Sequence, residues 1–162
     1  MKIKTIEQIR KIAAELKKQG KKIVTTNGCF DVLHIGHIRY LKVAKKLGDV
    51  LIIGLNTDSS VKQYKGDKRP LMPEDERAEM LSALEFVDYI VKFSERDPRN
   101  LLDAIKPDIH VKGGDYKMEQ IIEKDVVEKN GGKVVLLPLV HGKSTTNIIN
   151  RIITNSKIGS IS

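Results

Sequence analysis

Two histidines that flank a glycine are the residues of this chain with the clearest chemical potential. They lie in the segment His34-Ile35-Gly36-His37, where a spacing of three places both rings on one side of a helical turn. The segment follows a polar loop and precedes a helical pattern, so it marks the start of a helix. Amides at a helix start and the helix dipole favour a bound anion, and Gly36 lets that anion approach the backbone closely. We therefore predict an anion site at this loop.

A metal site or a structural role in the core would also use histidines at this spacing. Zinc needs a third or fourth ligand close by, and Cys29 and Asp31 are the only local candidates. A lone histidine is more often structural, but two that flank a glycine after a strand favour a ligand. We expect a phosphate site without a protein-bound metal.

Apolar patterns on both sides of this loop predict alternating strands and helices. The segments 22–27 and 50–55 are typical of strands, and the second is a continuous apolar run of the kind that is covered on both faces. Further strands are expected at 88–91, 108–112 and 134–137, and helices at 6–16, 36–47, from 73, after 98, at 118–129 and from 145. The polar stretch 56–71 is predicted to be a loop.

This alternation predicts an α/β fold, a Rossmann-like doubly wound five-stranded parallel sheet with helices on both faces. Ligands of such sheets bind at the carboxyl ends of the strands, near the switch point. The length of 162 residues suits a single domain. We expect an N-terminal helix packed on the core over 1–20, the functional domain over 21–154 and a loose tail over 155–162.

Composition and charge narrow the class of protein. The chain is 40% hydrophobic and 31% charged, an ordinary balance for a soluble domain. No apolar run approaches the roughly 20 residues of a membrane span, the N-terminus lacks a secretion signal, and one cysteine cannot form an internal disulfide. These features favour the cytoplasm. The net charge of +8 attracts anions, but no nucleic-acid-binding motif accompanies it, so we expect neither nucleic acid nor a membrane as partner.

The histidine segment resembles a known family element. His34-Ile35-Gly36-His37 is similar to the His-x-Gly-His of a nucleotidyltransferase superfamily that includes cytidylyltransferases and class I aminoacyl-tRNA synthetases. Gly28-Cys29-Phe30-Asp31 resembles the Gly-x-Phe-Asp of its cytidylyltransferase-like branch, and the likeness runs from about Lys22 to Ile153. The resemblance implies an enzyme that transfers a nucleoside monophosphate from a triphosphate, with Mg²⁺, to a small phosphorylated acceptor.

Roles for individual residues follow from this resemblance. His34 and His37 would donate to the α- and β-phosphates, Lys45 would reach the triphosphate, and Asp31 would be an indirect partner of Mg²⁺, which the nucleotide itself mainly holds. The nucleotide would also be bound by Asn27, Gly28, Cys29, Phe30, Asp31, Gly36, Lys112, Gly113, Asp115, Ser144, Thr145 and Thr146. The acceptor would be bound by Asn56, Asp58, Arg69 and Arg77, with Arg77 on its phosphate.

The segment 142–146 has a second interpretation, as a phosphate-binding P-loop. That motif needs a glycine five residues before Gly142, and position 137 is leucine, so the P-loop is excluded. The segment instead resembles the family's Ser/Thr-rich element at the start of the last helix. Many relatives carry Arg or Lys three residues after the last threonine. Here Ile149 stands at that position and Arg151 would lie on a different face, so the second phosphate cation stays open.

Four stretches most resemble the adenylyltransferases of ADP-heptose synthesis, namely 65–70, 83–88, 111–116 and 144–149. This likeness implies ATP and D-glycero-β-D-manno-heptose 1-phosphate as substrates, and a homodimer. In many bacteria that enzyme is fused behind a sugar kinase, and this chain would be a stand-alone form or an excised domain. The alternatives are a glycerol-3-phosphate cytidylyltransferase, an FAD synthetase-like enzyme, a nucleotide-binding regulator without turnover and an RNA-binding synthetase fragment.

Overall fold

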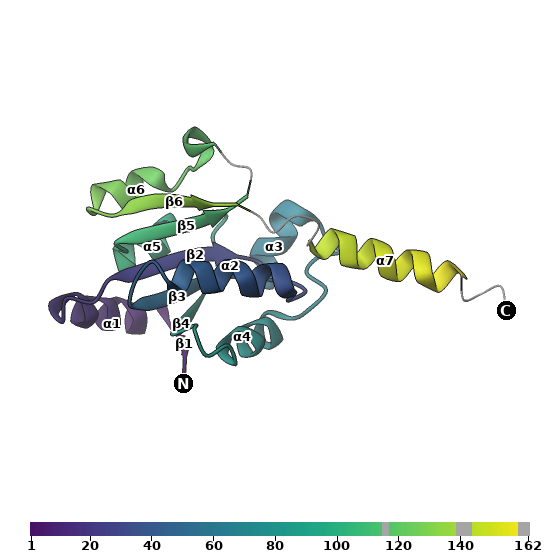
Figure 1. Ribbon diagram of the computed structural model, residues 1–162, viewed down its shortest axis with the longest axis horizontal. Coiled ribbons are helices and arrows are strands. Elements are labelled where there is room, and N and C mark those ends of the chain that lie inside the picture. Colours follow the sequence, from purple (N-terminus) through teal and green to yellow (C-terminus); the bar gives the residue numbers. More distant parts are fainter. Residues whose placement is uncertain (115–116, 139–143, 159–162) are drawn as a thin grey trace.

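A six-stranded parallel sheet forms the centre of the computed structural model, which describes residues 1–114, 117–138 and 144–158 (Figure 1). The strands are β1 (Ile3–Lys4), β2 (Ile23–Gly28), β3 (Val50–Asn56), β4 (Tyr89–Phe93), β5 (Ile109–Gly113) and β6 (Lys133–Leu137). The helices are α1 (Ile6–Lys18), α2 (Ile35–Lys45), α3 (Asp58–Lys65), α4 (Glu74–Ser82), α5 (Arg99–Ile105), the 3₁₀ helix η1 (Met118–Gln120), α6 (Lys124–Lys129) and α7 (Thr145–Ile158).

The strand order β1-β4-β3-β2-β5-β6 places β5 beside β2, the first long strand. From β2 the chain runs outward through β3 to β4, then crosses back to place β5 on the other side of β2, with Thr26 opposite Val111. The switch point therefore lies between β2 and β5, where such sheets bind ligands beyond the carboxyl ends. The loop after Gly28 and the end of β5 at Gly113 meet there.

Side chains that alternate along β3 build the core on both faces of the sheet. Leu51, Ile53 and Leu55 pack in the cluster that includes residues of α2 and α4, whereas Val50 and Ile52 pack with residues of α1 and α5. All seven residues of β3 are buried. Because both faces are covered, this strand needs apolar residues at every position rather than at every second one.

The doubly wound fold is confirmed, and three details differ from the prediction. The sheet has a sixth strand, β1, whose two residues are too few to show a periodic pattern. The stretch predicted to be a loop contains α3, which begins at a Thr57 cap and buries Ser60 and Val61. The last helix continues to Ile158, into the segment expected to be a loose tail. Short or largely polar elements of this kind carry little hydrophobic signal.

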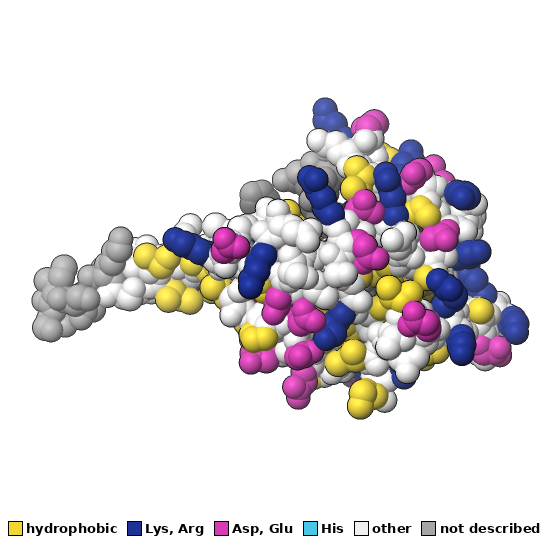
Figure 2. Space-filling view, turned by 180° about the vertical axis from the view of Figure 1, so that it is seen from behind, with side chains coloured by type: hydrophobic (Ala, Val, Ile, Leu, Met, Phe, Trp, Pro, Cys, Tyr) yellow, Lys and Arg dark blue, Asp and Glu magenta, His cyan; other side chains and the backbone are white. Residues whose placement is uncertain are grey.

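Helix α7 projects away from the body of the molecule (Figure 1). No helix within residues 1–114, 117–138 and 144–158 combines the length and apolar character that a membrane span requires. On the face seen in Figure 2, basic and acidic side chains are interspersed over the body, so the net charge is not gathered into one patch on that face. None of the described histidines is visible from that side.

Candidate functional site

A hollow of about 350 Å³ lies at the carboxyl ends of β2 and β5, against the first turns of α2 and α7. It is lined by Asn27, Gly28, Cys29, Phe30, Asp31, His34, Gly36, His37, Tyr40, Lys65, Arg69, Lys112, Gly113, Ser144, Thr145 and Thr146. We call it the first hollow. Most of the residues predicted to bind the nucleotide are among these, so the sheet and two helix starts bring together segments far apart in the sequence.

The two histidines of the first hollow also form the cap of α2. His34 Nδ1 accepts a hydrogen bond from the backbone N–H of Gly36 at 3.1 Å, and His37 Nδ1 accepts one from the N–H of His34 at 3.4 Å. A neutral imidazole with Nδ1 as acceptor must carry its proton on Nε2. The cap therefore fixes the tautomer that leaves each ring with an N–H donor for a ligand.

Burial keeps both rings neutral near pH 7. Burial lowers the pKa of His34, and burial together with the positive charges of His34 and Lys65 lowers the pKa of His37 to about 4. The rings stack with centroids 3.9 Å apart and an interplanar angle of 22°, an arrangement that two imidazolium ions would oppose by charge repulsion. The pair can thus donate hydrogen bonds to a phosphate without carrying a charge.

Phe30 turns the first loop beneath His37. Its φ of 47° lies in the left-handed region, which costs a residue with a side chain roughly 1–2 kcal/mol. The same turn places the Phe30 ring 5.2 Å from the His37 ring and 3.2 Å from where a Cβ on Gly28 would lie. Local strain of this kind is retained where the surroundings fix it, often at functional sites.

The floor of the hollow between β2 and β5 is fixed by Tyr40. Its hydroxyl lies 2.7 Å from Thr26 Oγ1 and donates to the Val111 carbonyl at 3.0 Å, so it ties the two strands together at the switch point. A Cβ on Gly113 would lie 2.8 Å from the Tyr40 ring, closer than real contacts allow. Glycine is therefore needed for β5 to pass over this ring.

At the start of α7, Ser144 Oγ accepts a hydrogen bond from the backbone N–H of Asn147 at 3.1 Å. Thr145 and Thr146 line the hollow beside it. This cap points the first turn of α7 at the same space as the first turn of α2. Asp115, which the sequence assigned to the nucleotide, lies outside the described residues.

A second hollow of about 440 Å³ lies on the other side of the first loop. It shares Asn27, Gly28, Cys29, Lys65 and Lys112 with the first. Its further lining is Asn56, Tyr64, Arg96, Asp97, Pro98, Gln120, Ile121, Ile122 and Glu123. The wall shared by the two hollows therefore consists of the end of β2 with Cys29, together with Lys65 and Lys112.

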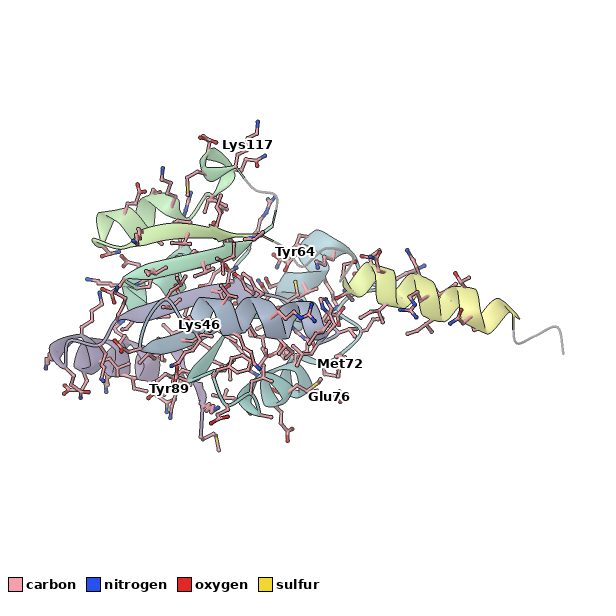
Figure 3. All side chains as sticks on the ribbon, in the orientation of Figure 1. Lys46, Tyr64, Met72, Glu76, Tyr89 and Lys117 are labelled. Carbon is pink, nitrogen blue, oxygen red and sulfur yellow. The ribbon has the colours of Figure 1, made fainter. Side chains whose placement is uncertain are left out.

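Sequence reasoning missed Lys65, which lines both hollows. It ends α3 and is exposed, and its charge contributes to the low pKa of His37. The neighbouring Tyr64 lies on α3 with its hydroxyl 2.6 Å from Cys29 Sγ, which fixes this helix end against the first loop (Figure 3). The available signal was a lysine just before Gly66, a typical helix end, within a stretch predicted to be a loop.

Lys45 lines neither hollow, although the resemblance places it on the triphosphate. It lies in the last turn of α2, and its neighbour Lys46 is labelled in Figure 3 at the end of that helix opposite α7. Its ammonium donates to Asp88 Oδ2 at 2.6 Å and to the Asp49 carbonyl. An 11-residue helix is roughly 16 Å long, so its last turn cannot reach a ligand at its first.

Arg77, which the resemblance assigned to the acceptor phosphate, is buried and pairs with Asp58, a second residue assigned to the acceptor. The Arg77 side chain is 0% exposed and lines neither hollow. It donates to the carbonyls of Met72 and Asn56 at 2.9 and 3.0 Å, to that of Cys29, and to Asp58 Oδ1 at 2.6 Å. Its role is structural, because it holds the first loop, the end of β3 and the segment before α4 together.

Asp31 joins the first loop to the segment 69–72. One carboxylate oxygen pairs with Arg69, and the other accepts from the backbone N–H groups of Leu71 and Met72 at 2.7 and 3.0 Å. Burial alone would raise the pKa of Asp31, but these hydrogen bonds and the Arg69 charge lower it. Both oxygens are thus committed, and among the described residues no group of three acidic, His or Cys side chains could hold a metal. Arg69 remains at the first hollow.

Comparison with known proteins bears on this geometry. A family model described as Cytidylyltransferase-like matches residues 25–151, from the end of β2 into α7. The matched region contains the shared wall, both histidines and the start of α7. The family predicted from the histidine segment is confirmed.

Two curated relatives are similar over nearly the whole chain. The bifunctional protein HldE of Syntrophotalea carbinolica is 50% identical over 158 residues, which are 98% of this chain and 32% of that protein. The bifunctional protein HldE of Geobacter metallireducens is 53% identical over 152 residues, 94% of this chain and 31% of the relative. The chain spans about a third of the length of these relatives.

Two solved structures share the fold. The lipopolysaccharide core biosynthesis protein from Thermoplasma volcanium superposes with a TM-score of 0.63 at 34% identity, covering 75% of this chain and 98% of that one. A pantoate-beta-alanine ligase from Francisella tularensis, crystallised with an ATP compound and beta-alanine, gives a TM-score of 0.62 at 23% identity over 85% of this chain and 67% of its own. The second likeness shows the fold alone.

Replacement of Arg77 by lysine tests its structural role. Lysine keeps the charge but cannot reach the Cys29, Asn56 and Met72 carbonyls and Asp58 at once, so we expect a loss of about 2–4 kcal/mol in the free energy of unfolding. Urea denaturation measures it. Arg39→Lys, an exchange of the same type on the first half of α2, serves as the control. An Arg77→Lys protein of unchanged stability would contradict the role assigned to this guanidinium.

Proposed function

Because the chain belongs to the cytidylyltransferase-like family, we propose that it transfers AMP from ATP to D-glycero-β-D-manno-heptose 1-phosphate. One observation carries the proposal: two neutral histidine donors face a hollow at two helix starts, and a second hollow with a cation of its own, Arg96, adjoins it. The likeness to HldE proteins and to a lipopolysaccharide core biosynthesis protein supports the sugar phosphate as acceptor.

The two hollows divide the substrates between them. ATP, which enters with Mg²⁺ bound to its phosphates, occupies the first hollow, where the starts of α2 and α7 face its triphosphate. The sugar 1-phosphate occupies the second, where Arg96 and Asn56 provide polar contacts away from the nucleotide. The reacting phosphates meet over the shared wall. In this arrangement Arg96 takes the role that the resemblance gave to Arg77, that of the cation for the acceptor phosphate.

The reaction needs positioning more than proton transfer. An acceptor phosphate oxygen attacks the α-phosphorus, the bond from that phosphorus to the bridging oxygen of the β-phosphate breaks, and pyrophosphate leaves with the electron pair. The attacking oxygen is already an anion, so no general base is required. His34 and His37 donate from Nε2, and Lys65 and Lys112 offset the repulsion between two anions. We place the reaction in the cytoplasm, where ATP and sugar phosphates are found, without nucleic acid or membrane partners.

The proposed reaction is tested by pyrophosphate release in a grid of four nucleoside triphosphates against several phosphorylated acceptors, including both anomers of the heptose 1-phosphate and glycerol 3-phosphate. We expect turnover with ATP and the β-anomer. Turnover with CTP and glycerol 3-phosphate alone would replace the proposed substrates. The absence of turnover with any pair would refute transfer itself.

The variant His37→Ala tests the role of this histidine in the same pyrophosphate-release assay. Removal of one preorganised donor typically lowers kcat by about 10²–10³-fold, and we expect at least the lower figure. Since the pKa of His37 is about 4 in the free protein, its ring stays neutral above that pH and should add no inflection to kcat/KM between roughly pH 6 and 9. Near-normal turnover of a folded His37→Ala protein would contradict the assignment of His37 as a phosphate donor.

Lys65 and Lys45 give a paired test of which lysine serves the phosphates. We expect Lys65→Ala to lower kcat by about 10²-fold, because it removes a cation at the shared wall. Lys45→Ala should leave kcat unchanged and reduce stability by about 1 kcal/mol or less, because the Asp88 pair is partly exposed. Steady-state kinetics measure kcat of both variants, and thermal unfolding measures their stability. The reverse order of effects would restore Lys45 to the site.

We also propose that two copies associate through α7. The helix projects from the body (Figure 1), and its Ile152 and Ile153 are 63% and 48% exposed. Apolar side chains on a projecting helix favour burial against a partner. The double change Ile152→Glu and Ile153→Glu should give a monomer by analytical ultracentrifugation, whereas Asn150→Glu with Asn155→Glu on the same helix should remain dimeric. A monomeric unmodified protein would refute the dimer.

A further inference from the structure

Lys112 stands where the two hollows meet, and its ammonium is held on both sides. Nζ donates to Asn27 Oδ1 at 2.9 Å and forms an ion pair with Glu123 Oε1. The lysine side chain is 19% exposed, while that of Glu123 is 3% exposed. A flexible four-carbon side chain with two fixed acceptors has lost most of its freedom, so this cation has one direction at the shared wall.

The carboxylate that holds Lys112 is itself held from behind. Glu123 Oε1 lies 3.4 Å from Nε2 of His110, a fully buried ring on β5. The other ring nitrogen, Nδ1, lies 2.9 Å from Oγ1 of Thr25 on β2. The hydroxyl donates to Nδ1 and the ring donates from Nε2, which gives one continuous chain of polar groups. It runs Thr25–His110–Glu123–Lys112–Asn27 and links β2, β5 and the start of α6.

Charges in this chain are fixed rather than shared. Burial lowers the pKa of His110, so the ring is neutral and its contact with Glu123 is a hydrogen bond. Burial alone would raise the pKa of Glu123, but the His110 hydrogen bond and the Lys112 charge outweigh it and lower that pKa to about 2. Glu123 is therefore an ionised carboxylate, and Lys112 is its cationic partner among these five hydrogen-bonded residues.

Stability alone does not account for a buried ionic chain of this kind. Apolar residues of similar volume commonly stabilise a core as well as, or better than, a buried ion pair. Glu123 lies 2% exposed just before α6, yet it reaches Lys112, one of the two lysines that line both hollows. The geometry suits preorganisation of a cation, because a donor whose direction is already set needs no reorganisation during the reaction.

We propose that Glu123, backed by His110, is a positioning residue that aims the Lys112 ammonium at the junction of the two hollows, where the attacking and attacked phosphates meet. The part of this inference that concerns catalysis rests on the proposed function. The part that concerns the orientation of Lys112 is independent of the proposed function. Glu123 borders the second hollow, but its side chain is only 3% exposed and its carboxylate is paired with Lys112, so we assign its effect to the orientation of that lysine.

A double-mutant cycle tests the coupling. Glu123→Gln keeps the shape and removes the charge, and we expect kcat to fall about 10-fold or more with a smaller change in the KM for ATP. In a Lys112→Met background the same change should alter kcat by less than about 2-fold, because the residue that it positions is gone. Equal losses in both backgrounds would overturn the proposal. Glu128→Gln, on the exposed side of α6, is the matched control and should leave kcat unchanged.

Amine labelling keeps this test separate from the proposed reaction. In the full chain without substrates, acylation of Lys112 followed by mass spectrometry should be at least about 3-fold faster in Glu123→Gln than in the unmodified protein, because an ion-paired ammonium is a poor nucleophile. Lys117 and Lys133 serve as internal references. An unchanged rate overturns the positioning role even if the enzyme is active, whereas faster labelling in a protein without turnover refutes only the proposed reaction.

If Glu123→Gln lowers the unfolding temperature by more than a few degrees, Glu123→Asp replaces it. Aspartate keeps the charge but is one methylene shorter, so it cannot reach Lys112 and His110 together. We expect kcat and labelling values between those of Glu123→Gln and the unmodified protein. Values equal to those of the unmodified protein would overturn the requirement for reach.

Discussion

One buried guanidinium joins the segments that surround the site. Arg77 donates to carbonyls of the first loop, the end of β3 and the segment before α4, and pairs with Asp58 at the start of α3. A charge without exposure is tolerated only when its donors are satisfied, so these segments must keep their places together. The first loop then presents its histidines, and α3 presents Lys65, in one fixed relation.

The fold and the centre of the site follow from the sequence, while the outer parts of the site do not. A continuous apolar run such as β3 and a loop such as 28–37 carry local signals of spacing and residue type. The role of Arg77 depends on which carbonyls come within reach after folding, and no local pattern encodes that. Lys45 is a different case, since its distance from the start of its own helix already separates it from His34. The sequence did not indicate Lys65, because α3 is short and polar and because the Tyr64–Cys29 contact that places its end forms only in the folded protein.

The site is cationic at its edge and neutral at its centre. Both histidines are kept uncharged by burial, whereas the cations Lys65 and Lys112 line both hollows. Charged rings at the centre would hold a triphosphate tightly before reaction and gain less as charge moves during transfer. In the proposed reaction, neutral donors with fixed tautomers would add their hydrogen bonds where charge develops, and the lysines would offset the repulsion between two phosphates.

Each donor of this site is fixed by a contact that does not involve a ligand. The histidine Nδ1 atoms are held by backbone amides, Lys112 by Glu123 and Asn27, and the start of α7 by its Ser144 cap. Lys65 differs, because its ammonium lies on an exposed residue at the end of a short helix. Its helix is held through Tyr64 and Cys29 rather than through the charge itself. Lys65 is thus held through its helix, whereas the histidines and Lys112 are held at their own polar atoms.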